Sequence, residues 1–146
     1  MKRKYKLLVI FSSLLLVSCF GLFDSDSDRI IGKYIIIWID LPQNQTISEE
    51  IELNSESSIG LIQEYVFAVG HNEDYIIAKQ HPTSGFENGF EINTKITNYF
   101  IIDMNRKTLK KGEKIFGPLK EVEFNKLRKK LKIESIEFDM NYPEKP

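Results

Sequence analysis

Apolar and polar residues alternate along most of the chain in short runs whose length is typical of β-strands. The runs are rich in β-branched and aromatic residues, and polar or Pro-containing stretches separate them. The segments that fit a strand are 34–39, 46–53, 64–70, 75–80, 98–103, 114–116 and 133–138. The pattern therefore predicts a protein built mainly from short strands.

The strongest hairpin signal is the pair 64–70 and 75–80, because both are β-rich and flank the short polar turn 71–74. The segment 46–53 alternates apolar with acidic residues. We expect it to pair with 34–39 across a Pro-containing turn. The sequence therefore predicts two antiparallel hairpins.

A long loop is predicted between the second hairpin and the next strand. Residues 81–95 contain one Pro, two Gly and several polar residues, and they include Phe86 and Phe90. Aromatic rings on such a loop often contact partners, so Phe86 and Phe90 form the candidate binding loop. The alternative is that both rings tuck under the loop and close the edge of the sheet.

The period changes at Gly117-Pro118, where Pro suits the first turn of a helix. Acidic residues near the start and basic residues at the end match the helix dipole, so we expect a helix over 118–132. One broad face suits packing on a sheet; its residues are Leu119, Val122, Leu127 and Leu131. The basic residues are Lys126, Arg128, Lys129, Lys130 and Lys132. They complement the dipole and add solubility, or they contact lipid headgroups or an acidic partner.

These elements predict an α+β fold, a small, mainly antiparallel sheet of about five to seven strands with one C-terminal helix packed on a face. The single domain is expected over 30–138, with a frayed tail at 139–146. We see no internal repeat in the sequence.

The N-terminus has the order of an export signal. A basic start is followed by an apolar run at 7–17 and by small residues. Eleven residues rise only about 16 Å as a helix, roughly half the thickness of a bilayer core. We therefore predict that 1–18 is a signal peptide rather than a transmembrane helix.

The end of this segment, Leu16-Val17-Ser18-Cys19, resembles the bacterial lipobox. The resemblance implies that a peptidase recognises Leu16, Val17 and Ser18, that Cys19 becomes the first mature residue, and that lipid on Cys19 holds the protein at a membrane. It would be the outer membrane if the host has one. The alternative is a soluble secreted protein whose only Cys lies near an ordinary cleavage site.

Cleavage changes the charge of the chain. The full sequence of 146 residues has 20 basic and 21 acidic side chains, a net charge of -1. Removal of four basic residues with the leader leaves 16 basic side chains and a net charge of -5. A basic excess is absent, which argues against a nucleic-acid partner. We interpret 19–29, with its acidic stretch at 24–28, as a lipidated Cys and a solvated tether.

Three segments resemble a family of small bacterial lipoproteins classed as a domain of unknown function. They are 72–80, 98–103 and 116–124, and the turn Asp40-Leu41-Pro42 also matches. Members often have an aromatic residue where this chain has His71. The resemblance implies the same strand–loop–strand–helix order and no activity that could be carried over.

A metal site is not indicated by the sequence. His71 and His81 flank the predicted hairpin and Glu73 and Asp74 lie in its turn, but a site needs three or four converging ligands. We interpret these residues as solvated turn residues, and we expect no metal and no cofactor.

Catalytic patterns are also lacking, since no nucleophile elbow is found and Ser84 near His81 gives no triad pattern. Most of the carboxylates Glu49, Glu50, Glu52 and Glu56 fit one exposed, alternating face. We therefore expect a non-enzymatic, lipid-anchored protein of the cell envelope that binds another protein or an envelope polymer. The alternative is an inhibitor or immunity-type protein against a toxin or hydrolase. Pull-down from membranes would separate the two, because one tight enzyme or toxin partner favours the alternative.

Overall fold

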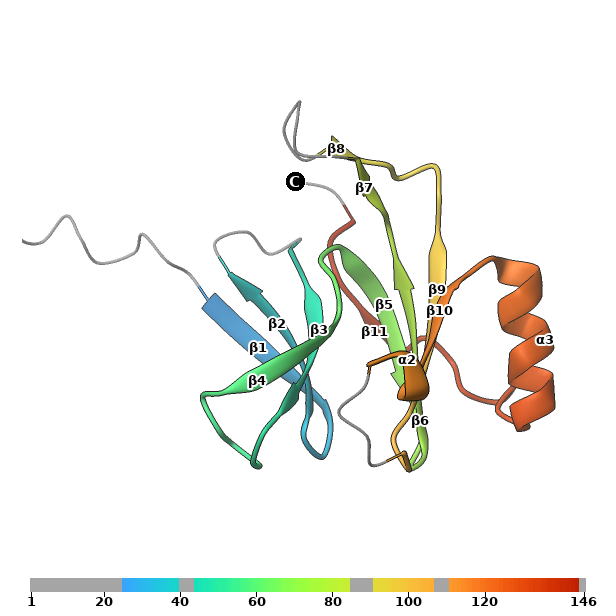
Figure 1. The fold of residues 1–146 in the computed structure, drawn as a ribbon. Helices are drawn as coiled ribbons and strands as arrows, with labels where there is room; N and C mark the ends of the chain where they lie inside the picture. The colour runs from blue at the N-terminus through green and yellow to red at the C-terminus, as the bar shows by residue number, and fades with distance from the viewer. Residues whose placement is uncertain (1–24, 40–43, 85–90, 107–110, 145–146) are drawn as a thin grey trace, which may run out of the picture.

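The computed structural model describes residues 25–39, 44–84, 91–106 and 111–144 (Figure 1). Several predictions lie outside these ranges. They concern the signal peptide at 1–18, the lipobox at 16–19, the Asp40-Leu41-Pro42 turn, and the loop residues Phe86 and Phe90.

The first part of the chain forms a four-stranded antiparallel sheet. Its strands follow the chain order β1 (Ser25–Ile31), β2 (Tyr34–Ile39), β3 (Thr46–Glu50) and β4 (Ser58–Ile62). Ile36 lies opposite Ile47 in the β2–β3 ladder, so the predicted pairing of these two segments is confirmed.

The second part forms a five-stranded antiparallel sheet in the order β10-β9-β6-β5-β11. The strands are β5 (Val66–His71), β6 (Tyr75–Gln80), β9 (Asn98–Asp103), β10 (Ile115–Leu119) and β11 (Met140–Asn141). A separate two-residue pair joins β7 (Thr83–Ser84) to β8 (Glu91–Ile92). The described helices are α2 (Lys111–Lys114) and α3 (Glu121–Leu131), and neither is long and apolar enough to span a membrane.

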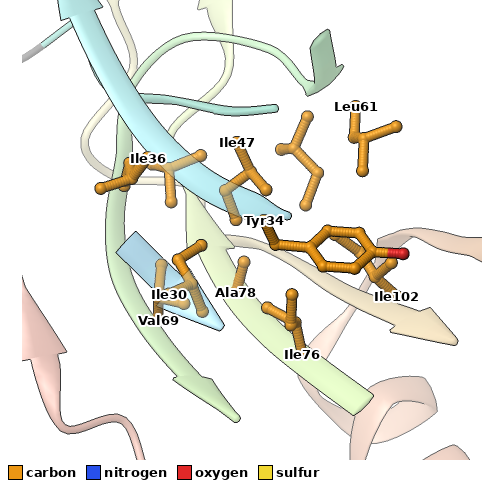
Figure 2. Packing of buried hydrophobic residues seen from close by; sticks show 11 residues of the cluster. Ile30, Tyr34, Ile36, Ile47, Leu61, Val69, Ile76, Ala78 and Ile102 are labelled. Atoms are coloured by element: carbon orange, nitrogen blue, oxygen red, sulfur yellow. The ribbon is translucent and has the colours of Figure 1, made fainter. Parts of the chain in front are cut away.

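The two sheets and α3 form three layers (Figure 1). One core lies between the sheets, where Ile36 and Ile47 meet Val69, Ile76 and Ile102 (Figure 2). A second core lies between the five-stranded sheet and α3. The expected α+β class is confirmed, and the strands are divided between two sheets rather than joined in one.

The centre of strand β6, Ile76 to Ala78, is a continuous apolar run because both faces of the strand are buried there. Successive side chains of a strand point to opposite faces. Ile76 and Ala78 therefore enter the core between the sheets, while Ile77 between them faces α3. In β9, Ile102 and Ile101 divide in the same way.

The predicted tether is wrong for residues 25–29, which belong to β1. Their side chains are exposed, yet their backbone pairs with β2 from Ser25 opposite Ile39 to Arg29 opposite Ile35. A ladder is formed by backbone groups, so a run of Asp and Ser can form an edge strand while its side chains stay in water. The domain therefore begins before residue 30.

The C-terminal predictions also need correction. Residues 133–138 do not form the expected strand, although Ile133 and Ile136 are buried in the core under α3. The expected tail instead contains β11, which pairs with β5. The segment that leads to β11 passes close to Gly70 of β5. A Cβ on Gly70 would lie 1.8 Å from the backbone oxygen of Glu137. Only Gly fits this position without a shift of the backbone.

The helix is shorter than predicted, and its buried face contains Phe124 in place of Val122. It begins at Glu121, because Pro118 lies in the edge strand β10, where a missing N–H is tolerated. Val122 is 80% exposed, whereas Phe124 is 1% exposed. Two positions along a helix differ by about 200° in direction, so these side chains face opposite sides. Leu127 and Leu131 pack beside Phe124 as expected.

Candidate binding groove

A groove of about 490 Å³ lies between the two sheets on the side where β4 and β10 are the outermost strands. Its lining comes from the end of β4, the β4–β5 link, and the segments around β6, β7, β9 and β10. The lining residues are Leu61, Ile62, Gln63, Glu64, Gln80, Pro82, Thr83, Asn98, Phe100 and Pro118. Apolar side chains and amides share this surface, a combination typical of ligand sites.

The amides at the groove are held by a short hydrogen-bond chain. Gln80 and Asn98 lie opposite each other in the β6–β9 ladder. Asn98 Nδ2 donates to Gln80 Oε1 over 3.1 Å, and Gln80 Nε2 donates to the backbone oxygen of Glu64 over 3.1 Å. Each amide nitrogen has one fixed acceptor, so the two amides are oriented before any ligand arrives.

The link between β4 and β5 forms part of the groove wall, and its course depends on the backbone conformation of Tyr65. Its φ of 67° lies in the left-handed region, which non-Gly residues rarely adopt. Tyr65 O accepts from His81 N over 3.1 Å, and the next residue, Val66, donates its N–H to Gln45 O over 3.1 Å. These bonds hold the link as the chain passes from one sheet to the other. Burial, together with the nearby Glu64, raises the pKa of Tyr65 above its ordinary value.

His81 is a buried structural residue, so its interpretation as a solvated turn residue is wrong. Its side chain is 3% exposed and its ring stacks on Phe67 at 4.3 Å between centroids. Nδ1 donates to the backbone oxygen of Ile96 over 2.8 Å, and Nε2 lies 3.1 Å from Glu144 Oε2. The histidine thereby joins the start of the predicted loop to the C-terminal segment.

His71 lies at the opposite end of the β5–β6 hairpin, where it pairs with Ile76. The two imidazoles are therefore not brought together. Within the described ranges, no group of three His, Cys, Asp or Glu side chains could hold a metal ion.

The predicted exposed face of carboxylates is wrong for Glu50. This side chain is buried, and its two oxygens accept from Arg29 Nη1 and Nη2 over 2.8 and 3.0 Å. The hydrogen bond from Arg29 lowers the pKa of Glu50, and the backbone N–H of Asn54 adds to this effect. Glu52 and Glu56 are exposed as expected.

Glu49 belongs to a cluster that joins the two sheets. Lys114, whose side chain is 4% exposed, bonds to Glu49 and donates to Tyr34 Oη over 3.2 Å. Burial by itself would lower the pKa of Lys114, but the hydrogen bonds to Glu49 and Tyr34 outweigh it and raise the pKa. Lys114 therefore stays charged, as an inter-sheet contact requires.

The basic end of α3 includes one residue with a structural role. Arg128 donates to the backbone oxygens of Glu134 and Ile136 over 2.6 and 2.5 Å, which fixes the segment that follows the helix. Lys126, Lys129, Lys130 and Lys132 are exposed. In Figure 1 this end of α3 lies at the lower right, far from the start of β1 at the left.

Sequence reasoning found part of the groove and missed the rest. Pro82 and Thr83 come from the predicted binding loop, and Phe100 from a predicted strand. Strand β4 was not predicted, because the polar residues at 54–58 resemble a gap and the strand is only five residues long. The run Ile59-Gly60-Leu61-Ile62 is the signal that could have found it.

A family profile described as a protein of unknown function (DUF3997) matches residues 31–142. No curated protein and no solved structure matches the chain. The matched range contains β2 through β11 and every residue that lines the groove, and it begins after Cys19. The expectation of an uncharacterised family is thereby confirmed: the chain belongs to the DUF3997 family of proteins of unknown function.

Proposed function

We propose that this protein is a non-enzymatic, lipid-anchored binding module of the bacterial cell envelope, and that its ligand occupies the groove between β4 and β10. The observation that carries the binding role is the groove itself. Phe100, Ile62 and Pro118 supply apolar surface, while Gln80 and Asn98 supply amides that are already oriented. Apolar contact provides affinity, and a few fixed polar groups provide orientation.

The anchoring role rests on the sequence. The lipobox places the only Cys of the chain, Cys19, after a basic and then apolar leader. Six residue steps separate Cys19 from the first residue of β1, a reach of about 20 Å at most. A protein lipidated at Cys19 would therefore hold its folded domain close to the membrane.

The mature charge of -5 supports lipid rather than surface charge as the membrane attachment, because an acidic body is repelled by anionic lipids. The position of α3 supports the same conclusion. Its Lys-rich end lies far from β1, the strand that follows the proposed anchor (Figure 1). We therefore assign these lysines to the helix dipole and to solubility.

The anchor is tested by fatty-acid labelling of cells that express the full chain. We expect Cys19→Ala to abolish labelling and to release or mis-sort the protein. Ser13→Ala changes a small polar residue of the same leader outside the lipobox, and it should keep the label. Labelling that persists in Cys19→Ala would refute the anchor.

The groove is tested in the same cells with a photo-crosslinking residue in place of Thr83, which lies in the groove lining. Val122 on α3 is the matched control, because it is 80% exposed on a different layer. We expect position 83 to crosslink to an envelope protein or polymer and position 122 to give no such product. Equal products at both positions, or none at position 83, would contradict a binding role for the groove.

A further inference from the structure

Four strands form the edges of the two main sheets, and three of them carry features that hinder the addition of another strand. β1 carries Asp26, Asp28 and Arg29, while β11 is only two residues long. β10 contains Pro118, and its register shifts between Phe116 and Leu119. Charges, short length, Pro and bulges are the usual protections of an edge strand.

β4 is different. Its sequence, Ser58-Ile59-Gly60-Leu61-Ile62, has no charge and no Pro. It pairs with β3 on one side, and it is the last strand of its sheet on the other. Ile59 is 39% exposed, and Leu61 and Ile62 line the groove. The unprotected edge and the groove are therefore one continuous surface.

The hydrogen bonds around β3 show which groups of β4 point outward. Glu50 N donates to Lys33 O towards β2, whereas Ile51 N donates to Ser57 O towards β4. Backbone groups alternate between the two sides of a strand, so Ile59 bonds towards β3, while Ser58 and Gly60 point to the free edge. Among the described residues, no backbone group outside the sheet bonds to Ser58 or Gly60. These are the groups that an added strand would use.

The charge around this edge is negative. Glu56 precedes β4 and Glu64 follows it, and Glu52 lies in the same hairpin. No cation of the described residues pairs with these three carboxylates. An incoming strand with basic residues at its ends would place them next to Glu56 and Glu64.

A second copy of the chain fits less well. Antiparallel pairing of two β4 strands about Gly60 would place Glu56 of one copy opposite Glu64 of the other, at both ends of the pair. Like charges directly opposite each other destabilise a ladder. The charges therefore favour a different partner over self-association.

We propose that β4 and the groove form a strand-addition site for an extended, apolar segment of a partner protein that is flanked by Lys or Arg. This rests on the proposed binding function and names its partner class. Main-chain hydrogen bonds to Ser58 and Gly60 supply affinity, and alternate side chains of the partner enter the groove.

The test uses the full chain in detergent and two seven-residue peptides with blocked ends and the same alternating Val and Thr centre. One peptide has Lys at both ends and the other has Glu. Fluorescence anisotropy should show the Lys peptide binding at least about tenfold more tightly at low salt, with a smaller difference at high salt. Gly60→Pro removes an outward N–H and should abolish binding, with circular dichroism verifying that the variant is folded.

A second test reverses the charges beside β4 and does not depend on whether Gly60→Pro folds. Glu56→Lys combined with Glu64→Lys should reverse the preference to the Glu peptide, while Glu121→Lys on α3 should leave it unchanged. An equal affinity for both peptides, an unchanged preference after reversal, or a concentration-dependent dimer that Gly60→Pro abolishes would each overturn strand addition. Crosslinking at Thr83 without peptide binding would refute the strand site and leave the proposed function intact.

Discussion

The alternation of its segment predicts that Glu50 is exposed, but the side chain is buried in the structure. It lies on β3 and bonds to Arg29 on β1, so the pair crosses over β2. A carboxylate that is buried needs a cation and hydrogen bonds to offset the loss of water. The partner that decides its burial is 21 positions away, in a segment whose composition is typical of a linker.

This pair predicts a loss of stability in acid. The pKa of Glu50 is lower in the folded protein than in the unfolded chain, chiefly through the bond to Arg29. Its contribution is therefore present above the unfolded pKa and disappears as pH falls through the folded pKa. Glu50→Gln should lower the free energy of unfolding at neutral pH, and its difference from the wild type should shrink in acid.

Urea unfolding from pH 7 to about pH 3 measures this difference across the carboxyl range. Glu52→Gln is the matched control, because Glu52 is exposed and its replacement should leave the free energy of unfolding close to that of the wild type. A gap between wild type and Glu50→Gln that stays constant with pH would contradict the assignment.

At the scale of elements, α3 is placed by one aromatic side chain. The Phe124 ring lies 4.8 Å from the ring of Tyr99 and 6.1 Å from the ring of Phe138, between centroids. The bond from Lys120 N to Glu123 Oε2, at 3.0 Å, fixes the start of the helix. A helix of 11 residues gains most of its stability from such packing rather than from propensity.

Phe124→Ala should therefore lower the free energy of unfolding by about 3–5 kcal/mol, the usual cost of removing a buried aromatic ring. Val122→Ala on the same helix should change it by less than about 0.5 kcal/mol, because Val122 is exposed. Denaturant unfolding of both variants measures the two values. Equal effects would show that the helix packs through another face.

At the scale of the whole molecule, side-chain polar contacts join the described parts of the two sheets at two places on the margins of the apolar core. Lys114 bonds to Tyr34 and Glu49 at one of them. At the other, Tyr142 Oη donates to Asp28 Oδ2 over 3.2 Å, and its ring lies 6.3 Å from the ring of Trp38. The second contact shows that part of the predicted tail completes the fold.

Alkaline pH should reduce the contribution of Tyr142 to the stability of the fold. Burial, and then the carboxylate of Asp28, raise the pKa of Tyr142 above its ordinary value. A raised folded pKa stabilises the protein below the unfolded pKa, and this contribution is lost as pH rises towards the folded pKa. Tyr142→Phe should cost at most about 1 kcal/mol at neutral pH, the value of one hydrogen bond.

Between pH 9 and pH 11, Tyr142→Phe should lose less stability than the wild type. In the wild type the hydroxyl of Tyr142 loses its proton in the unfolded chain first, which favours unfolding, and the variant has no such hydroxyl. Urea unfolding at these two pH values measures the change. An alkaline loss identical to that of the wild type would exclude Tyr142 as its source.

Only part of the groove could be predicted from the sequence. The loop that supplies Pro82 and Thr83 was predicted, since Gly, Pro and polar residues mark loops locally. Gln80 and Asn98 lie 18 positions apart, and the β6–β9 register brings their amides together. No local pattern marks that register, because both residues are ordinary polar ends of strands.

The sequence by itself determined the segments 34–39, 75–80 and 98–103 as strands, and it determined the α+β class. These properties depend on side-chain period and turn chemistry, which act between near neighbours. The tertiary structure alone decided that the strands divide into two sheets, that 25–31 and 140–141 add edge strands, and that Phe124 rather than Val122 faces the core. The physical reason is that a ladder is formed by backbone groups that nearly every residue carries, so distant packing chooses the partner.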